Sequence, residues 1–66
     1  MRYLFIAYDA QNKCLVKKRY STEEAALARL DNLYADHPTA TRGGVFDVVE
    51  GDVVDYVDYE QDSVAV

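Results

Sequence analysis

The chain has 66 residues, a formal net charge of −5 at pH 7, one cysteine and one histidine. This length allows one small domain, residues 1–66, whose core is thin because short chains bury a smaller share of their surface. Cys14 has no second cysteine to pair with, and with His37 as the only imidazole the composition argues against a structural metal. Self-association is the remaining source of additional burial, so a homodimer is expected.

The charge is distributed unevenly along the chain. Residues 1–44 carry all seven Lys and Arg side chains against five acids and sum to +2, whereas residues 45–66 contain only acids and sum to −7. The seven carboxylates are Asp47, Glu50, Asp52, Asp55, Asp58, Glu60 and Asp62. Such an asymmetry governs which partners a surface attracts more than it governs the fold.

The N-terminal segment predicts a β-hairpin. Residues 3–8 form a short apolar run rich in aromatic and β-branched side chains, which is typical of a buried strand. Residues 9–13 contain the Asp and Asn of a turn, and residues 14–20 read as the second strand. Within that strand Cys14, Val16 and Tyr20 are expected to face the core, and Lys17 and Arg19 to face solvent.

A helix is predicted next. The segment Ser21-Thr22-Glu23-Glu24 matches a capping box, in which the Ser21 hydroxyl accepts from an amide of the first turn and Glu24 reaches back. One apolar stripe with helical spacing follows: Ala26, Leu27, Leu30, Leu33 and Tyr34. The helix is expected to end before Pro38, because a proline disfavours helical geometry at the preceding residue.

The C-terminal part predicts a second hairpin. Residues 39–44 read as a polar loop closed by Gly43-Gly44, residues 45–50 as a third strand, Gly51 as a turn and residues 52–59 as a fourth strand. The order ββαββ predicts an α+β fold, an antiparallel four-stranded sheet with one helix packed on one face. Residues 61–66 are expected to be a frayed tail or an edge extension.

The predicted sheet has more apolar side chains than one helix can cover. Strict alternation along the fourth strand places Val54 and Tyr56 on one face and Val53, Val57 and Tyr59 on the other. The face without the helix therefore exposes apolar groups, together with either the even-numbered or the odd-numbered residues of the first strand. Exposed apolar area on a small protein marks an interaction surface, and a second subunit stacking there is one explanation.

The acidic segment has three possible roles. If the last strand continues, Asp58, Glu60 and Asp62 form a row spaced by about 6.8 Å, which imitates a nucleic-acid backbone and suits a basic groove. Alternatively, the carboxylates keep the protein soluble and repel edge-to-edge pairing, or they pair with the basic strand of a second subunit. For the basic cluster, residues 17–19, pairing with these carboxylates across strands is favoured over nucleic-acid binding.

Catalytic and targeting motifs are not recognisable. No Ser-His-Asp arrangement, phosphate-binding loop or calcium loop is present in the sequence, so we expect no enzyme activity, no cofactor and no metal. Cys14 reads as a small hydrophobe, and a lone cysteine fits a reducing compartment. The first residues lack a signal-peptide pattern, which predicts a cytoplasmic protein without membrane or direct nucleic-acid contacts.

The sequence thus predicts a non-enzymatic acidic inhibitor or adaptor of the kind a phage or mobile element encodes. Its C-terminal hairpin is expected to meet the basic surface of a protein partner, such as a nucleic-acid-handling protein. The predicted partner-binding residues are Asp47, Glu50, Asp52, Asp55, Tyr56, Asp58, Tyr59, Glu60 and Asp62. The alternative is a structural homodimer whose exposed sheet face is the self-association interface and whose acidity serves solubility only.

Overall fold

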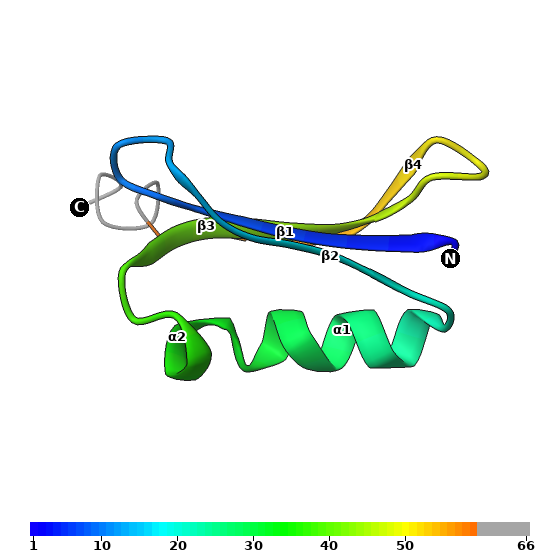
Figure 1. Cartoon of the computed structure of the whole chain (residues 1–66), viewed down its shortest axis with the longest axis horizontal. Helices are drawn as coiled ribbons and strands as arrows, with labels where there is room; N and C mark the ends of the chain where they lie inside the picture. Colours follow the sequence, from blue (N-terminus) through cyan, green and yellow to red (C-terminus); the bar gives the residue numbers. More distant parts are fainter. Residues whose placement is uncertain (60–66) are drawn as a thin grey trace.

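The computed structural model describes residues 1–59 and shows one antiparallel sheet with two helical segments on one side of it (Figure 1). The elements are β1 (Tyr3–Asp9), β2 (Cys14–Tyr20), α1 (Glu23–Asp31), α2 (Leu33–Asp36), β3 (Ala40–Asp47) and β4 (Asp52–Asp58). The four strands are ordered β2-β1-β3-β4, and every neighbouring pair is antiparallel. The predicted ββαββ architecture is confirmed. The predicted tail, 61–66, lies outside the described residues.

The β1–β2 hairpin closes through the side chain of Asp9. Its Oδ1 accepts hydrogen bonds from the amides of Gln11 and Lys13, both at 2.9 Å, and Asn12 adopts a φ of 65° that Asn tolerates better than most residues. The register shifts after Ala7, so that Cys14 pairs with Tyr8 and is exposed. The expected inward position of Cys14 is therefore wrong, because a bulge interrupts the alternation.

The helical segment begins one residue later than the sequence predicts. Thr22, not Ser21, is the N-cap, and its hydroxyl accepts from the amide of Ala25 at 3.2 Å. Asn32 separates α1 from α2, and both its side-chain amide, at 2.8 Å, and its backbone amide, at 3.2 Å, donate to the carbonyl of Ala28. The second segment, α2, ends at Asp36, shortly before Pro38 as expected.

The core lies between the helices and the sheet. Its buried side chains are Phe5, Ala7, Ala26, Leu30, Leu33, Ala40 and Val45. Leu33 packs directly against Gly43, where an added Cβ would lie 2.7 Å from Leu33 Cδ2. The predicted polar loop over residues 39–44 is thus wrong: Gly43 lies within β3, and its missing side chain lets α2 approach the sheet. Tyr34, expected in the core, is 62% exposed and meets Tyr59 edge to face.

The β3–β4 connection is built around Asp47. Asp47 Oδ1 accepts from the amides of Val49 at 3.0 Å and Glu50 at 3.2 Å, and the Asp47 carbonyl accepts from the amide of Gly51 at 2.8 Å. Gly51 has a φ of 74°, a left-handed conformation that glycine adopts without strain. The turn therefore spans residues 48–51, and β3 is three residues shorter at this end than predicted.

Candidate interaction surface

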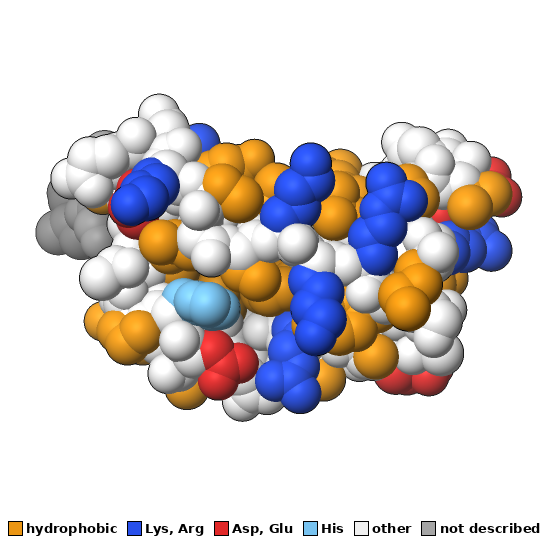
Figure 2. All heavy atoms as spheres, viewed as in Figure 1, with side chains coloured by type: hydrophobic (Ala, Val, Ile, Leu, Met, Phe, Trp, Pro, Cys, Tyr) orange, Lys and Arg blue, Asp and Glu red, His pale blue; other side chains and the backbone are white. Residues whose placement is uncertain are grey.

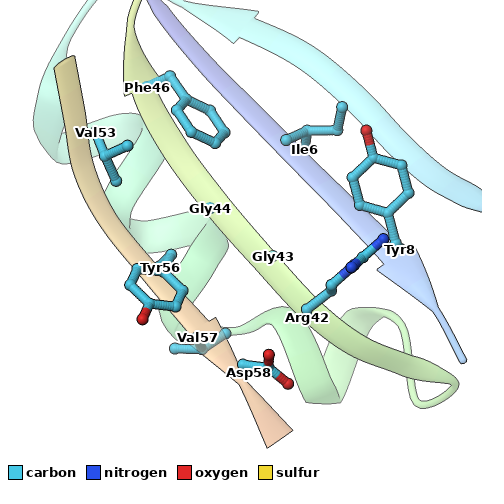
Figure 3. Close-up of a pocket in the computed structure, with 10 residues that line it drawn as sticks. All are labelled: Ile6, Tyr8, Arg42, Gly43, Gly44, Phe46, Val53, Tyr56, Val57 and Asp58. Carbon is cyan, nitrogen blue, oxygen red and sulfur yellow. The ribbon is translucent and has the colours of Figure 1, made fainter. Parts of the chain in front are cut away.

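The face of the sheet opposite the helices carries a shallow apolar groove across β1, β3 and β4 (Figure 3). Its floor and apolar walls include Ile6, Tyr8, Gly44, Phe46, Val53 and Tyr56. Its volume of about 290 Å³ is at the lower limit of pockets that enclose small ligands. A groove of this size and shape suits one or two side chains of a macromolecule better than a cofactor.

The pleat of β1 decides which apolar side chains enter this groove. Phe5 and Ala7 are buried under the helices, so the neighbouring Leu4, Ile6 and Tyr8 lie on the open face and are half-buried. The helices therefore cover the odd-numbered side of β1, a choice that the sequence pattern left open.

A bulge in β4 brings two large apolar side chains to the same face. Val45 pairs with Asp55 but the next residue, Phe46, pairs with Val53, so β4 has one extra residue at this point. As a result Val53 and Tyr56, which are 57% and 62% exposed, both line the groove. Strict alternation placed them on opposite faces, and that expectation is wrong because a bulge reverses the alternation locally.

Gly44 forms the floor of the groove. A Cβ there would lie 3.3 Å from the Cβ of Tyr56 and 3.4 Å from Cε2 of Phe46. Figure 3 shows Phe46, Val53 and Tyr56 around this bare stretch of backbone. Gly43 thus lets the helix pack closely on one face of the sheet, and Gly44 leaves the floor of the groove open on the other face.

One end of the groove is polar. The Arg42 guanidinium lies over the Tyr8 ring, 4.9 Å from its centroid, and donates a hydrogen bond to Asn12 Oδ1. Asp58 is the cross-strand partner of Arg42 in the β3–β4 register and is half-buried. The groove therefore offers an apolar floor with a cation and a carboxylate at one end.

The structure separates the predicted partner-binding residues. Asp52, Asp55 and Glu50 are exposed on the hairpin and on β4, the edge strand, and Tyr56 lies in the groove. Tyr59 lies elsewhere, half-buried against the core and Tyr34. Glu60 and Asp62 lie outside the described residues.

Asp47 has a structural role. It is only 8% exposed and accepts hydrogen bonds from Arg2 Nε at 2.9 and 3.0 Å and from the terminal guanidinium nitrogen at 2.7 Å. The hydrogen bonds from Arg2, supported by the amides of Val49 and Glu50, lower the pKa of Asp47 below its usual value. Asp47 therefore ties Arg2 to the β3–β4 hairpin, and its carboxylate is occupied by contacts within the chain.

The strand order places opposite charges at opposite edges of the sheet. Lys17, Lys18 and Arg19 lie on β2, whereas the acids of β4 lie beyond the two central strands. Figure 2 shows several Lys and Arg side chains across the middle of one face, where few Asp and Glu side chains appear. Among residues 1–59, β2 lies beside β1 and not beside β4, so the structure does not set the basic cluster across strands from Asp52, Asp55 or Asp58 as expected.

Comparison with protein-family models, curated proteins and solved structures finds no match. Among residues 1–59, no helix is long and apolar enough to cross a membrane. The same part of the chain holds no group of three His, Cys, Asp or Glu side chains arranged for a metal ion.

Proposed function

We propose that this chain is a non-enzymatic binding protein, an inhibitor or adaptor, that docks a basic protein partner on β4 and the adjoining groove. The observation that carries the proposal is that Val53 and Tyr56, both more than half exposed, stand beside the carboxylates Asp52 and Asp55 on an edge strand. An apolar side chain of the partner enters the groove on the open face, while its Lys and Arg side chains reach around the β4 edge to the carboxylates of Asp52 and Asp55, which point to the other face.

The two parts of this surface contribute differently to binding. An exposed ion pair is worth only about 0–1 kcal/mol, so Asp52 and Asp55 mainly raise the association rate and select a basic partner. Affinity comes from the apolar groups, and exposed tyrosines at the centre of an interface often contribute about 2 kcal/mol or more. Tyr56 is the residue on which binding is expected to depend most.

Affinity capture from nuclease-treated lysate of the source cell tests the proposal. We expect the wild-type protein to retain one basic protein at low salt and to release most of it at high salt. Tyr56→Ala should reduce capture about thirtyfold, the equivalent of roughly 2 kcal/mol. Tyr34→Ala is the matched control, because Tyr34 has the same exposed fraction, 62%, but does not line the groove.

The charged part of the surface has its own test in the same assay. The double substitution Asp52→Asn, Asp55→Asn should weaken capture at low salt and remove most of its salt dependence. Equal capture by wild type and Tyr56→Ala, or equal loss with Tyr34→Ala, would contradict a role for the groove. Capture of nothing by the wild-type protein would contradict the proposal as a whole.

A homodimer is the second candidate, favoured by the same exposed apolar groups of the open face. Two sheets stacked face to face would bury the Tyr56 and Val53 side chains of both copies. Such a dimer stops at two copies, and Tyr56→Lys should dissociate it while Asp52→Asn, Asp55→Asn leaves it intact. Sedimentation of the purified protein distinguishes these outcomes.

A further inference from the structure

We propose that copies of this chain associate head to tail through their sheet edges, with β4 of one copy pairing with β2 of the next. Within residues 1–59 both strands are edges of the sheet, and both have seven residues. Edge strands present unpaired backbone groups that another strand can complete. This inference is independent of the proposed function, because it needs no other protein.

The strand directions allow a second copy in the same orientation to extend the sheet. β1 is antiparallel to both β2 and β3, so β2 and β3 run the same way, and β4 runs opposite to them. A second copy in the same orientation therefore brings its β2 antiparallel to β4 of the first. The helices of both copies then lie on the same side, and the joint has the same geometry as the strand pairs within the chain.

The charges select this pairing over its alternatives. β2 carries Lys17, Lys18 and Arg19 and no acid, whereas β4 carries Asp52, Asp55 and Asp58 and no base. Pairing β2 with β2, or β4 with β4, sets like charges opposite each other, which is destabilising. Like edges of two copies thus repel, whereas β4 of one copy attracts β2 of another. Repeated head-to-tail contacts of this kind produce an open chain of copies.

The pleat agrees with the charges. Asp55 and Lys18 both point to the helix-covered side of the sheet, since their cross-strand partners are core residues. Tyr56 and Lys17 both lie on the open face, opposite Gly44 and Ile6 respectively. An antiparallel register that sets Asp55 opposite Lys18 also sets Tyr56 opposite Lys17. This register forms one pair of opposite charges on the helix-covered side, and side chains keep their faces over residues 55–57 of β4 and 16–18 of β2. The match ends at the bulges, since Val53 lies on the open face and Tyr20, opposite it, on the helix-covered side.

One hydrogen bond on β4 opposes pairing with another strand. Asp55 Oδ1 accepts a hydrogen bond from the amide of Tyr56 at 2.8 Å, which occupies a backbone donor of β4. An incoming β2 strand must displace this contact, and Lys18 offers the released carboxylate a new partner. Association is therefore expected to be weak, reversible and dependent on protein concentration and salt.

Sedimentation velocity of the full chain, from micromolar to millimolar protein, tests the inference. At low salt we expect the mass to rise above the 7.5 kDa of one copy without a plateau at two, and to fall back at high salt. The variant Lys17→Glu, Lys18→Glu, Arg19→Glu has two acidic edges. The variant Asp52→Lys, Asp55→Lys has a basic edge in place of the acidic one.

Each variant alone should remain monomeric, and an equimolar mixture of the two should recover the association. The control Glu23→Lys, Glu24→Lys changes the net charge as much as Asp52→Lys, Asp55→Lys but lies on α1, and it should associate like wild type. Circular dichroism confirms that every variant is folded. A monomeric wild type at low salt, or association of either edge variant alone, would overturn the inference. A discrete dimer dissociated by Tyr56→Lys would replace it with face-to-face stacking.

Discussion

Gly43 and Gly44 are neighbours in β3, but we expect their replacement by alanine to have very different effects. At Gly43 the new methyl group would lie 2.7 Å from Leu33 Cδ2 and 3.2 Å from the carbonyl oxygen of Ile6. Leu33 has no exposed surface, so its methyl group cannot move into solvent. At Gly44 the nearest atoms are the Asp55 carbonyl oxygen and the Tyr56 Cβ, both at 3.3 Å, and no atom of the helices is among them. The helix α2 packs on Gly43, whereas the groove lies over Gly44.

The size of the Gly43→Ala effect follows from two opposing terms. Overpacking a close-packed core costs about 1–3 kcal/mol. Replacing a glycine within a strand recovers about 0.5–1 kcal/mol of backbone entropy. The net loss in the free energy of unfolding is about 1 kcal/mol, and for a chain of this size it lowers Tm by about 4–8 °C. Gly44→Ala should leave the free energy of unfolding within about 0.5 kcal/mol of wild type.

Thermal and urea denaturation followed by circular dichroism measure both values. Adding Leu33→Val to Gly43→Ala should make the combined loss smaller than the sum of the separate losses, because the shorter side chain relieves the contact. In the capture assay Gly44→Ala should weaken binding, since its methyl group fills the floor of the groove. Equal stability of the two alanine variants, or strictly additive losses in the double variant, would refute the packing of Leu33 on Gly43.

Two further predictions concern local hydrogen bonds. Because Thr22 caps α1, Thr22→Ala should lower the free energy of unfolding by about 1 kcal/mol, and Ser21→Ala should lower it by much less. A larger effect of Ser21→Ala in thermal denaturation would contradict this cap. Because Arg2 lowers the folded-state pKa of Asp47, the pair stabilises the protein above the unfolded pKa of about 3.9, and this contribution is lost as pH falls through the folded value. The stability difference between wild type and Asp47→Asn should therefore shrink in strong acid, and a constant difference in urea titrations across pH would argue against the pair.

The regular elements could be predicted because their signals are local. An unbroken apolar run predicted β1, the segment 14–20 predicted β2 with the bounds that the structure has, and Pro38 predicted the end of the helical segment. Periodicity also identified Ala26, Leu30 and Leu33 as core residues. These features depend on backbone preferences and on the spacing of side chains along one segment.

The candidate surface could be predicted only in part. The sheet contains more apolar side chains than one helix can cover. This comparison alone predicted an exposed apolar face and placed Tyr56 among its candidate residues. Phe46 was missed as a groove residue, and Ile6 belonged to one of two alternatives left open, because the choice between the two faces of the sheet depends on where the helices pack. The bulge that brings Val53 and Tyr56 to the same face could not be predicted from the sequence, since it arises from the register of two paired strands.

By itself the sequence determined the class of fold, the approximate bounds of most elements and the separation of acidic from basic segments along the chain. Only the tertiary structure decided that the basic strand and the acidic strand lie at opposite edges, and that Asp47 belongs to an ion pair with Arg2. The physical reason is that strand order and long-range pairs depend on contacts between residues far apart in the chain. Local propensity and periodicity carry no information about such contacts.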